Sequence, residues 1–75
     1  MNNERRKRIK EACDKIWEAI NILTEVHDEE EEAYDNLPDG LQYSERGEQM
    51  SDNVYALEDA VSTLEDLETT LEDLL

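Results

Sequence analysis

The chain has 75 residues, a net charge of −15, a single cysteine and no phenylalanine. A chain of this length forms at most one domain, here residues 1–75, and one cysteine excludes an internal disulfide. No apolar run approaches the ~18 residues that a membrane-spanning helix needs, and the basic start lacks the apolar core of a signal peptide. We therefore expect a cytoplasmic protein that does not bind membranes.

The first predicted element is a long helix over about residues 3–36. Asn2 or Asn3 is suited to cap its start. Eight positions within it recur at alternating steps of four and three residues, which is the heptad spacing of a helix that packs along one edge. Most of them are apolar: Ile9, Cys13, Ile16, Ile20, Leu23, His27, Glu30 and Tyr34.

A turn over residues 37–43 and a second helix over about residues 44–75 follow. Pro38 and Gly40 interrupt the helical pattern. Ser44 lies near the start of the second helix, in which the tripeptide Leu-Glu-Asp recurs at 57–59, 64–66 and 71–73. The heptad positions of this helix are Met50, Val54, Leu57, Val61, Leu64, Glu68, Leu71 and Leu75.

The two sets of heptad positions match when paired residues have numbers that sum to 84, as Ile20 and Leu64 do. This mirror register predicts an all-α fold, an antiparallel helical hairpin. Further apolar residues lie beside the paired edge and widen it, so we expect a homodimer in which two hairpins form a four-helix bundle. A monomer that orders only on a partner is the alternative. The predicted dimer-interface residues are Trp17, Ile22, Val26, Leu67 and Leu74.

The charges are distributed unevenly along the chain. Six of the seven basic residues lie within the first fifteen positions, whereas residues 16–75 carry nineteen acids and only Arg46. In a hairpin the basic start lies beside the acidic end, and we expect these opposite charges to help to fix the register. They also cancel the basic field, which argues against direct nucleic-acid binding. The acids of that end are Glu65, Asp66, Glu68, Glu72 and Asp73.

Residues 27–35 read HDEEEEAYD and contain six acids and no base. Like charges four residues apart repel on a helix, and its C-terminal end disfavours anions. The run is either a solvated face or a surface that binds a basic partner. A dimer of ~48 Å hairpins carries one negative charge per ~1.6 Å, close to the ~1.7 Å of duplex DNA. The candidate partner-binding acids are Asp28, Glu29, Glu31, Glu32, Glu58, Asp59, Glu65, Asp66, Glu72 and Asp73.

Two patterns resemble metal-binding sites but do not provide a full set of ligands. His27, Glu30 and Glu31 share a helix face, but the register sets Leu57 and Val54 opposite them, so we expect a polar layer and no metal. Residues 35–46 approach a calcium-binding loop, yet Leu37 and Arg46 occupy ligand positions.

Catalysis is not expected either. Cys13 and His27 are fourteen residues apart on one helix, or ~21 Å, beyond the reach of a hydrogen bond. Carboxylate pairs are numerous, but a narrow hairpin offers no pocket that would change their pKa values. The sequence therefore predicts neither an enzyme nor a cofactor.

The segment DEEEEAYDNLPDGLQYSERGEQM at 28–50, with the Leu-Glu-Asp heptads after it, resembles small acidic helical proteins of bacteriophages and bacterial mobile elements. This resemblance implies a place in a bacterial host cell. It also implies an anti-defence role, such as an anti-CRISPR inhibitor that imitates nucleic acid.

Two functions remain open at this stage. The first is an acidic inhibitor that binds the nucleic-acid-binding surface of a nuclease or another basic host protein. The second is a structural or scaffolding coiled coil that acts through its apolar residues, with charge serving only solubility.

Overall fold

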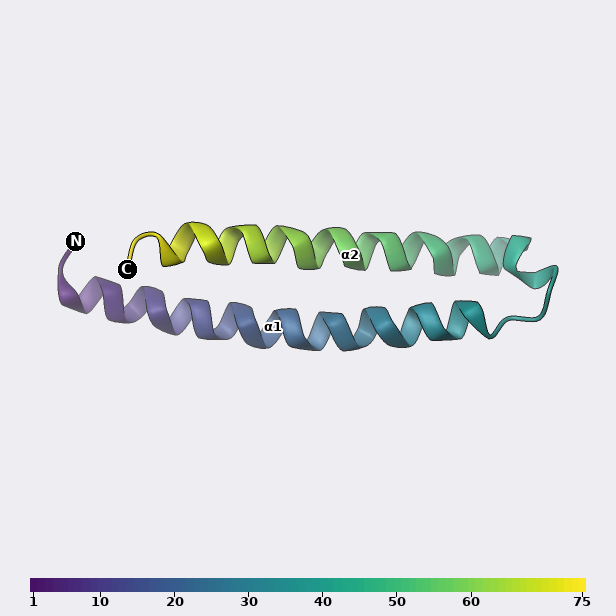
Figure 1. The fold of residues 1–75 in the computed structure, drawn as a ribbon, viewed down its shortest axis with the longest axis horizontal. Helices are drawn as coiled ribbons and strands as arrows, with labels where there is room; N and C mark the ends of the chain where they lie inside the picture. The colour runs from purple at the N-terminus through teal and green to yellow at the C-terminus, as the bar shows by residue number, and fades with distance from the viewer.

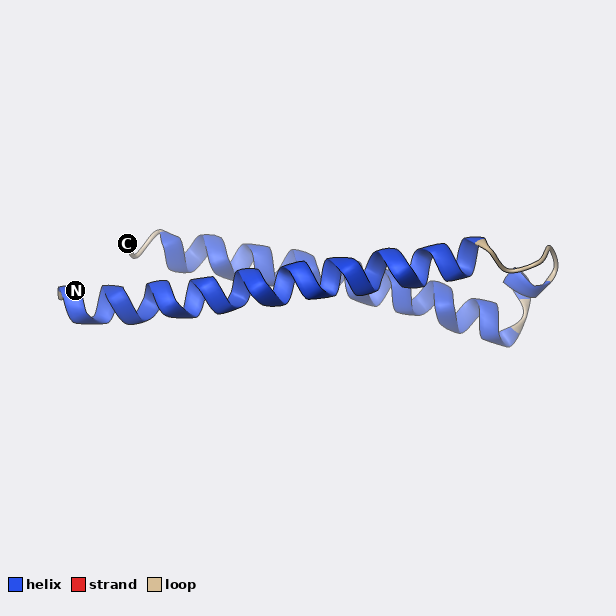
Figure 2. Cartoon of the chain, turned by 90° about the horizontal axis from the view of Figure 1, so that it is seen from below, coloured by secondary structure: helices blue, strands red, loops and turns tan.

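The computed structural model describes residues 1–75 and is an antiparallel hairpin of two helices (Figure 1). Helix α1 spans Asn3–Asp35, a short 3₁₀ helix spans Leu41–Tyr43, and helix α2 spans Glu45–Glu72. The two termini lie at the same end, and α1 and α2 wind past each other along their length (Figure 2). The all-α hairpin predicted from the heptad pattern is confirmed.

Both helices begin at side-chain caps. The Oδ1 atom of Asn2 accepts a hydrogen bond from the backbone N–H of Arg5 at 2.8 Å, and the Oγ atom of Ser44 accepts one from the N–H of Gly47 at 3.2 Å. Such caps satisfy N–H groups that have no partner within the helix. The chain turns at Gly40, whose φ of 89° lies in the left-handed region that glycine adopts without strain.

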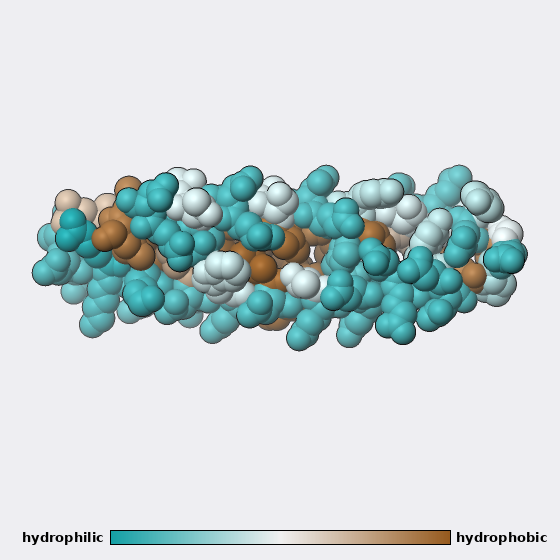
Figure 3. All heavy atoms as spheres, in the orientation of Figure 1, coloured by the Kyte–Doolittle hydropathy of each residue, from teal (hydrophilic) through white to brown (hydrophobic).

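The predicted heptad positions form the contact between the helices, which we call the seam. All sixteen are buried or partly buried except Leu75, which is 50% exposed beyond the end of α2. The most buried members are Cys13, Ile20, Val54 and Glu68, each less than 10% exposed. In a space-filling view, hydrophobic atoms line this contact while hydrophilic side chains cover the outer sides of both helices (Figure 3).

The seam is a narrow core. The molecule measures 58 × 15 × 13 Å, and its radius of gyration of 17.1 Å exceeds the ~11 Å expected for a compact domain of this length. No side chain is completely buried, and only three hydrophobic residues are 8% exposed or less. The hairpin therefore leaves much of its apolar surface in contact with water.

Gly47, in the first turn of α2, is buried against the 3₁₀ turn. A Cβ atom at this position would collide with the backbone carbonyl oxygens of Leu41 and Gln42. The absence of a side chain thus lets the connection fold back onto the start of α2.

Replacing Gly47 by alanine should lower the melting temperature. Alanine has the higher helix propensity by about 1 kcal/mol, so a loss of stability would show that the steric collision outweighs this gain. Thermal unfolding followed by circular dichroism measures the change. Ser62→Ala, at an exposed position of α2, is the matched control and should be neutral or slightly stabilising. A Gly47→Ala variant as stable as the control would contradict the close approach.

Candidate functional site

A polar cluster centred on His27 lies in the half of the hairpin nearer the turn, at the sixth of the eight seam positions of α1. The Nδ1 atom of His27 lies 3.0 Å from Asp28 Oδ1, and its Nε2 atom lies 3.0 Å from Glu58 Oε1 and 3.7 Å from Glu31 Oε2. The imidazole side chain is 16% exposed because it occupies a seam position. One ring therefore joins two acids of α1 to one acid of α2.

These acids stabilise the charged form of the ring. Hydrogen bonds with Asp28 and then with Glu58 raise the pKa of His27 above its ordinary value of 6.5, and burial opposes them less strongly. In its doubly protonated form the ring donates from both nitrogens and bridges the two helices. A second polar bridge lies nearby, where Asn53 donates to Glu30 Oε2 at 2.9 Å.

The prediction that the residues opposite His27 offer no further ligand is wrong. Leu57 is its partner in the simple register, but the next residue, Glu58, reaches across the edge of the seam and contacts the imidazole. Pairing numbers that sum to 84 treats the contact as a line of facing residues. Real helices also bring together the residues that flank the seam on the same side.

The basic start and the acidic end interact more weakly than the sequence predicts: the charge of Lys10 on α1 partly offsets the rise in the pKa of Glu72 on α2. No Lys or Arg of α1 forms an ion pair with α2, and Lys10–Asp14, at 4.0 Å within α1, is the only ion pair that involves either residue type. Glu68, predicted to contribute to the acidic end, is buried in the seam instead. The bases and the remaining acids at this end are thus exposed to solvent.

Glu68 is an anomaly of the seam. It is 3% exposed, and its Oε1 atom has no hydrogen-bond partner. A hydrogen bond between the two carboxyl groups, followed by burial, raises the pKa of Glu72 one turn away. Burial and then the charge of Glu68 raise the pKa of the Cys13 thiol, which keeps this cysteine in its unreactive form.

All ten candidate partner-binding acids lie on the exposed surface, but they differ in surroundings. Asp28, Glu31 and Glu58 gather around His27. The others have no ion-pair partner: Glu29, Glu32, Asp59, Glu65, Asp66, Glu72 and Asp73.

A more regular feature emerges when exposed positions are followed in steps of seven residues. The position farthest from the seam is an acid in every heptad of both helices, and all of these acids are exposed. Successive acids along a helix are ~10.5 Å apart. We call these two rows the outer acidic lines: Glu4, Glu11, Glu18, Glu25 and Glu32 on α1, and Glu45, Asp52, Asp59, Asp66 and Asp73 on α2. The sequence contains this pattern, which the repeat of Leu-Glu-Asp reveals only in part.

The residues beside the seam divide into two flanks. Trp17, which the sequence predicts in the dimer interface, is two heptads before Glu31; it therefore lies on the flank that carries His27's acidic partners, away from the other four predicted interface residues. Val26 lies on the opposite flank, which also carries small and branched apolar side chains from both helices. We call this flank, with Ile22 next to it, the apolar face: Ala12, Ala19, Ile22, Val26, Ala60, Leu67 and Leu74.

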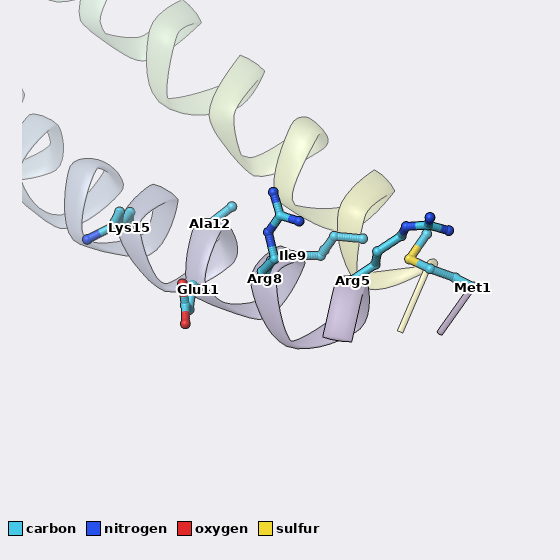
Figure 4. Close-up of a pocket in the computed structure, with 7 residues that line it drawn as sticks. All are labelled: Met1, Arg5, Arg8, Ile9, Glu11, Ala12 and Lys15. Atoms are coloured by element: carbon cyan, nitrogen blue, oxygen red, sulfur yellow. The ribbon is translucent and has the colours of Figure 1, made fainter. Parts of the chain in front are cut away.

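A basic groove continues the apolar face at the start of α1. Ile9, Ala12 and Met1 provide its apolar floor, and Arg5 and Arg8 with other charged residues rim it. Figure 4 shows Arg8, Ile9 and Ala12 on the side of α1 toward the end of α2, with Glu11 pointing away. The groove is an open surface, and it brings positive charge to one end of the apolar face.

Comparison with models of protein families, with curated proteins and with solved structures yields no match. Neither helix of the structure is both long and apolar enough to cross a membrane. The segment that approaches a calcium loop in sequence forms the end of α1, the 3₁₀ turn and the cap of α2. The features that can indicate a function are therefore the two flanks of the seam and the outer acidic lines.

Replacing Glu68 by leucine should raise the melting temperature at pH 7 by several degrees, since an unsatisfied buried polar group costs about 1–3 kcal/mol. The gain should shrink at acidic pH. Glu72 has a raised folded pKa, so its favourable contribution is complete below its ordinary pKa of 4.5 and is lost as pH rises through the folded value.

Melting curves of wild type, Glu68→Leu and the exposed control Glu65→Leu between about pH 4.5 and 7.5 measure this difference. The control removes the same formal charge, so it corrects for the general repulsion among acids. A gain for Glu68→Leu that equals the control, or that does not change with pH, would show that the buried carboxylate carries no special cost.

Proposed function

We propose that this chain is a non-enzymatic interaction module that forms a homodimer and binds a basic nucleic-acid-binding surface of another protein through its outer acidic lines. The observation that carries the proposal is the unbroken acid at the outermost position of ten heptads, without one lysine or arginine. An acidic surface that served only solubility would need neither this regularity nor the exclusion of bases. A phage-borne inhibitor of a host defence nuclease is its most concrete form.

The charge density supports imitation of nucleic acid. Two copies of a chain with charge −15, packed side by side over the 58 Å length, carry one charge per about 1.9 Å. Duplex DNA carries one per ~1.7 Å. A basic cleft that attracts phosphates at this spacing meets a similar field along the dimer.

The apolar face supports the homodimer. Ile22, Val26, Leu67 and Leu74 are all exposed in the single hairpin, Ile22 by 59%. Arg8, Lys15, Ile22 and Glu29 follow one another at steps of seven residues, so one row along this face runs from basic to acidic. In a twofold pair centred on Ile22, Lys15 of each copy lies beside Glu29 of the other, and opposite charges set the direction of packing.

The predicted dimer is tested by its mass in solution. Wild type should have twice the 8.8 kDa mass of the chain in sedimentation equilibrium. Val26→Ser with Leu67→Ser should shift the protein toward monomer, because both are large, exposed side chains of the apolar face, one from each helix.

Two controls locate the interface. Trp17→Ser, on the other flank, and Tyr55→Ser, at a residue that is 65% exposed, should leave the dimer intact. Loss of the dimer in Trp17→Ser, with no effect of the double variant, would contradict the proposed interface and place it on the flank that carries Trp17.

The acidic lines are tested by capture from a bacterial lysate on immobilised protein. Captured proteins should elute with duplex DNA as competitor, and raising salt from roughly 50 to 200 mM should weaken binding at least about tenfold. The reversals Glu25→Lys and Glu32→Lys, both on the outer line of α1, should abolish capture.

Asp35→Lys with Asp39→Lys is the matched control, because it changes net charge equally but leaves the lines intact. Equal loss in both double variants would reduce the effect to bulk charge. Capture that does not change with salt or with added DNA, but is lost in Val26→Ser with Leu67→Ser, would instead support the scaffolding function. That function acts through apolar contacts.

A further inference from the structure

We propose that His27, Glu31 and Glu58 form a binding site for a divalent transition-metal ion of the zinc type, which ties α1 to α2 in the half of the hairpin nearer the turn. This site lies on the flank opposite the apolar face and does not depend on the proposed function.

The spacing of the donor atoms fits such an ion. The Nε2 atom of His27 lies 3.0 Å from Glu58 Oε1 and 3.7 Å from Glu31 Oε2, and the three atoms all lie within 4.8 Å of one another. Ligands ~2.0–2.2 Å from a tetrahedral zinc ion are about 3.3–3.5 Å apart. Small rotations of the two exposed carboxylates suffice to close the set, and a water molecule completes four ligands.

The histidine is already oriented for coordination. His27 occupies a partly buried seam position, and its Nδ1 atom contacts Asp28 Oδ1 at 3.0 Å. When Nδ1–H donates to this carboxylate, the neutral ring directs the lone pair of Nε2 toward Glu31 and Glu58. Metal-binding histidines are commonly held by such an outer carboxylate, which fixes the tautomer and strengthens the ligand.

The chemistry of the set selects the class of metal. One imidazole nitrogen and two carboxylate oxygens suit zinc and its first-row neighbours, whereas calcium and magnesium prefer oxygen ligands alone. The metal takes the place of the proton at Nε2, so binding releases a proton when the ring is charged. It also holds together a section of the seam in which His27 and Glu30 replace apolar residues.

Titration of the full-length protein with zinc chloride, followed by calorimetry with magnesium in excess, tests the site. We expect one zinc ion per chain and a rise in melting temperature. His27→Gln and Glu58→Gln should weaken binding by at least about tenfold, and Asp28→Asn by roughly tenfold or more, as outer partners do. Glu65→Gln, at an exposed acid one heptad after Glu58, should bind as wild type does.

The single histidine of the chain gives a second, independent readout. Zinc should shift the imidazole resonances of wild type in an NMR spectrum, and nitrogen shifts should identify Nε2 as the ligand, while calcium should leave them in place. This experiment uses wild-type protein and stands even where a variant folds poorly. Unmoved imidazole signals, or equal zinc affinity in a folded His27→Gln variant, would mean that zinc meets only surface carboxylates and would overturn the site.

Discussion

The seam between α1 and α2 is the one contact on which the structure depends, and it is barely wide enough to form a hydrophobic core. Two helices share a single line of heptad positions, and no side chain along it is fully removed from water. Stability increases with the apolar area that is buried, so a core this thin leaves only a small margin of stability. Local features therefore matter more than in a larger domain. Caps at Asn2 and Ser44 fix where the helices start, and Gly47 allows the connection to pack closely.

Polar residues interrupt this thin core at three heptad positions, and their surroundings separate them. His27 is bridged to Glu58, and Glu30 is bound by Asn53 from the opposite helix, so both retain partners across the seam. Such pairs add little stability but penalise a shifted register, in which the bridges to Glu58 and Asn53 would be lost. Glu68 has no comparable partner at Oε1. The half of the seam nearer the turn thus uses polarity for specificity, whereas the end near Cys13 bears an uncompensated cost.

The heptad spacing was sufficient to predict the hairpin, its turn and the seam, because a helix that packs along one side must place a seam residue there about once per turn. Leu75 departs from it because α2 ends at Glu72, so that Leu75 no longer lies on a helix. The pattern did not reveal the contact of Glu58 with His27 or the lack of a hydrogen-bond partner for Glu68 Oε1. Both depend on side-chain reach and on which flank of the seam each residue occupies, and a one-dimensional register contains neither. The basic start and the acidic end are neighbours, yet no Lys or Arg of α1 comes within ion-pair distance of an acid of α2, and Lys10 acts on Glu72 only through longer-range attraction.

Separation of the surfaces resolves a conflict within the proposal. Two chains of charge −15 repel, so the same acids that attract a basic partner oppose dimer formation. The outer acidic lines lie away from the apolar face, and the row from Arg8 to Glu29 supplies local attraction where two copies meet. Salt then acts on the two associations in opposite directions. It screens the repulsion between copies and so favours the dimer, while it weakens the attraction between the acidic lines and a basic surface. An assembly held by its apolar face can therefore remain intact under conditions that release its partner.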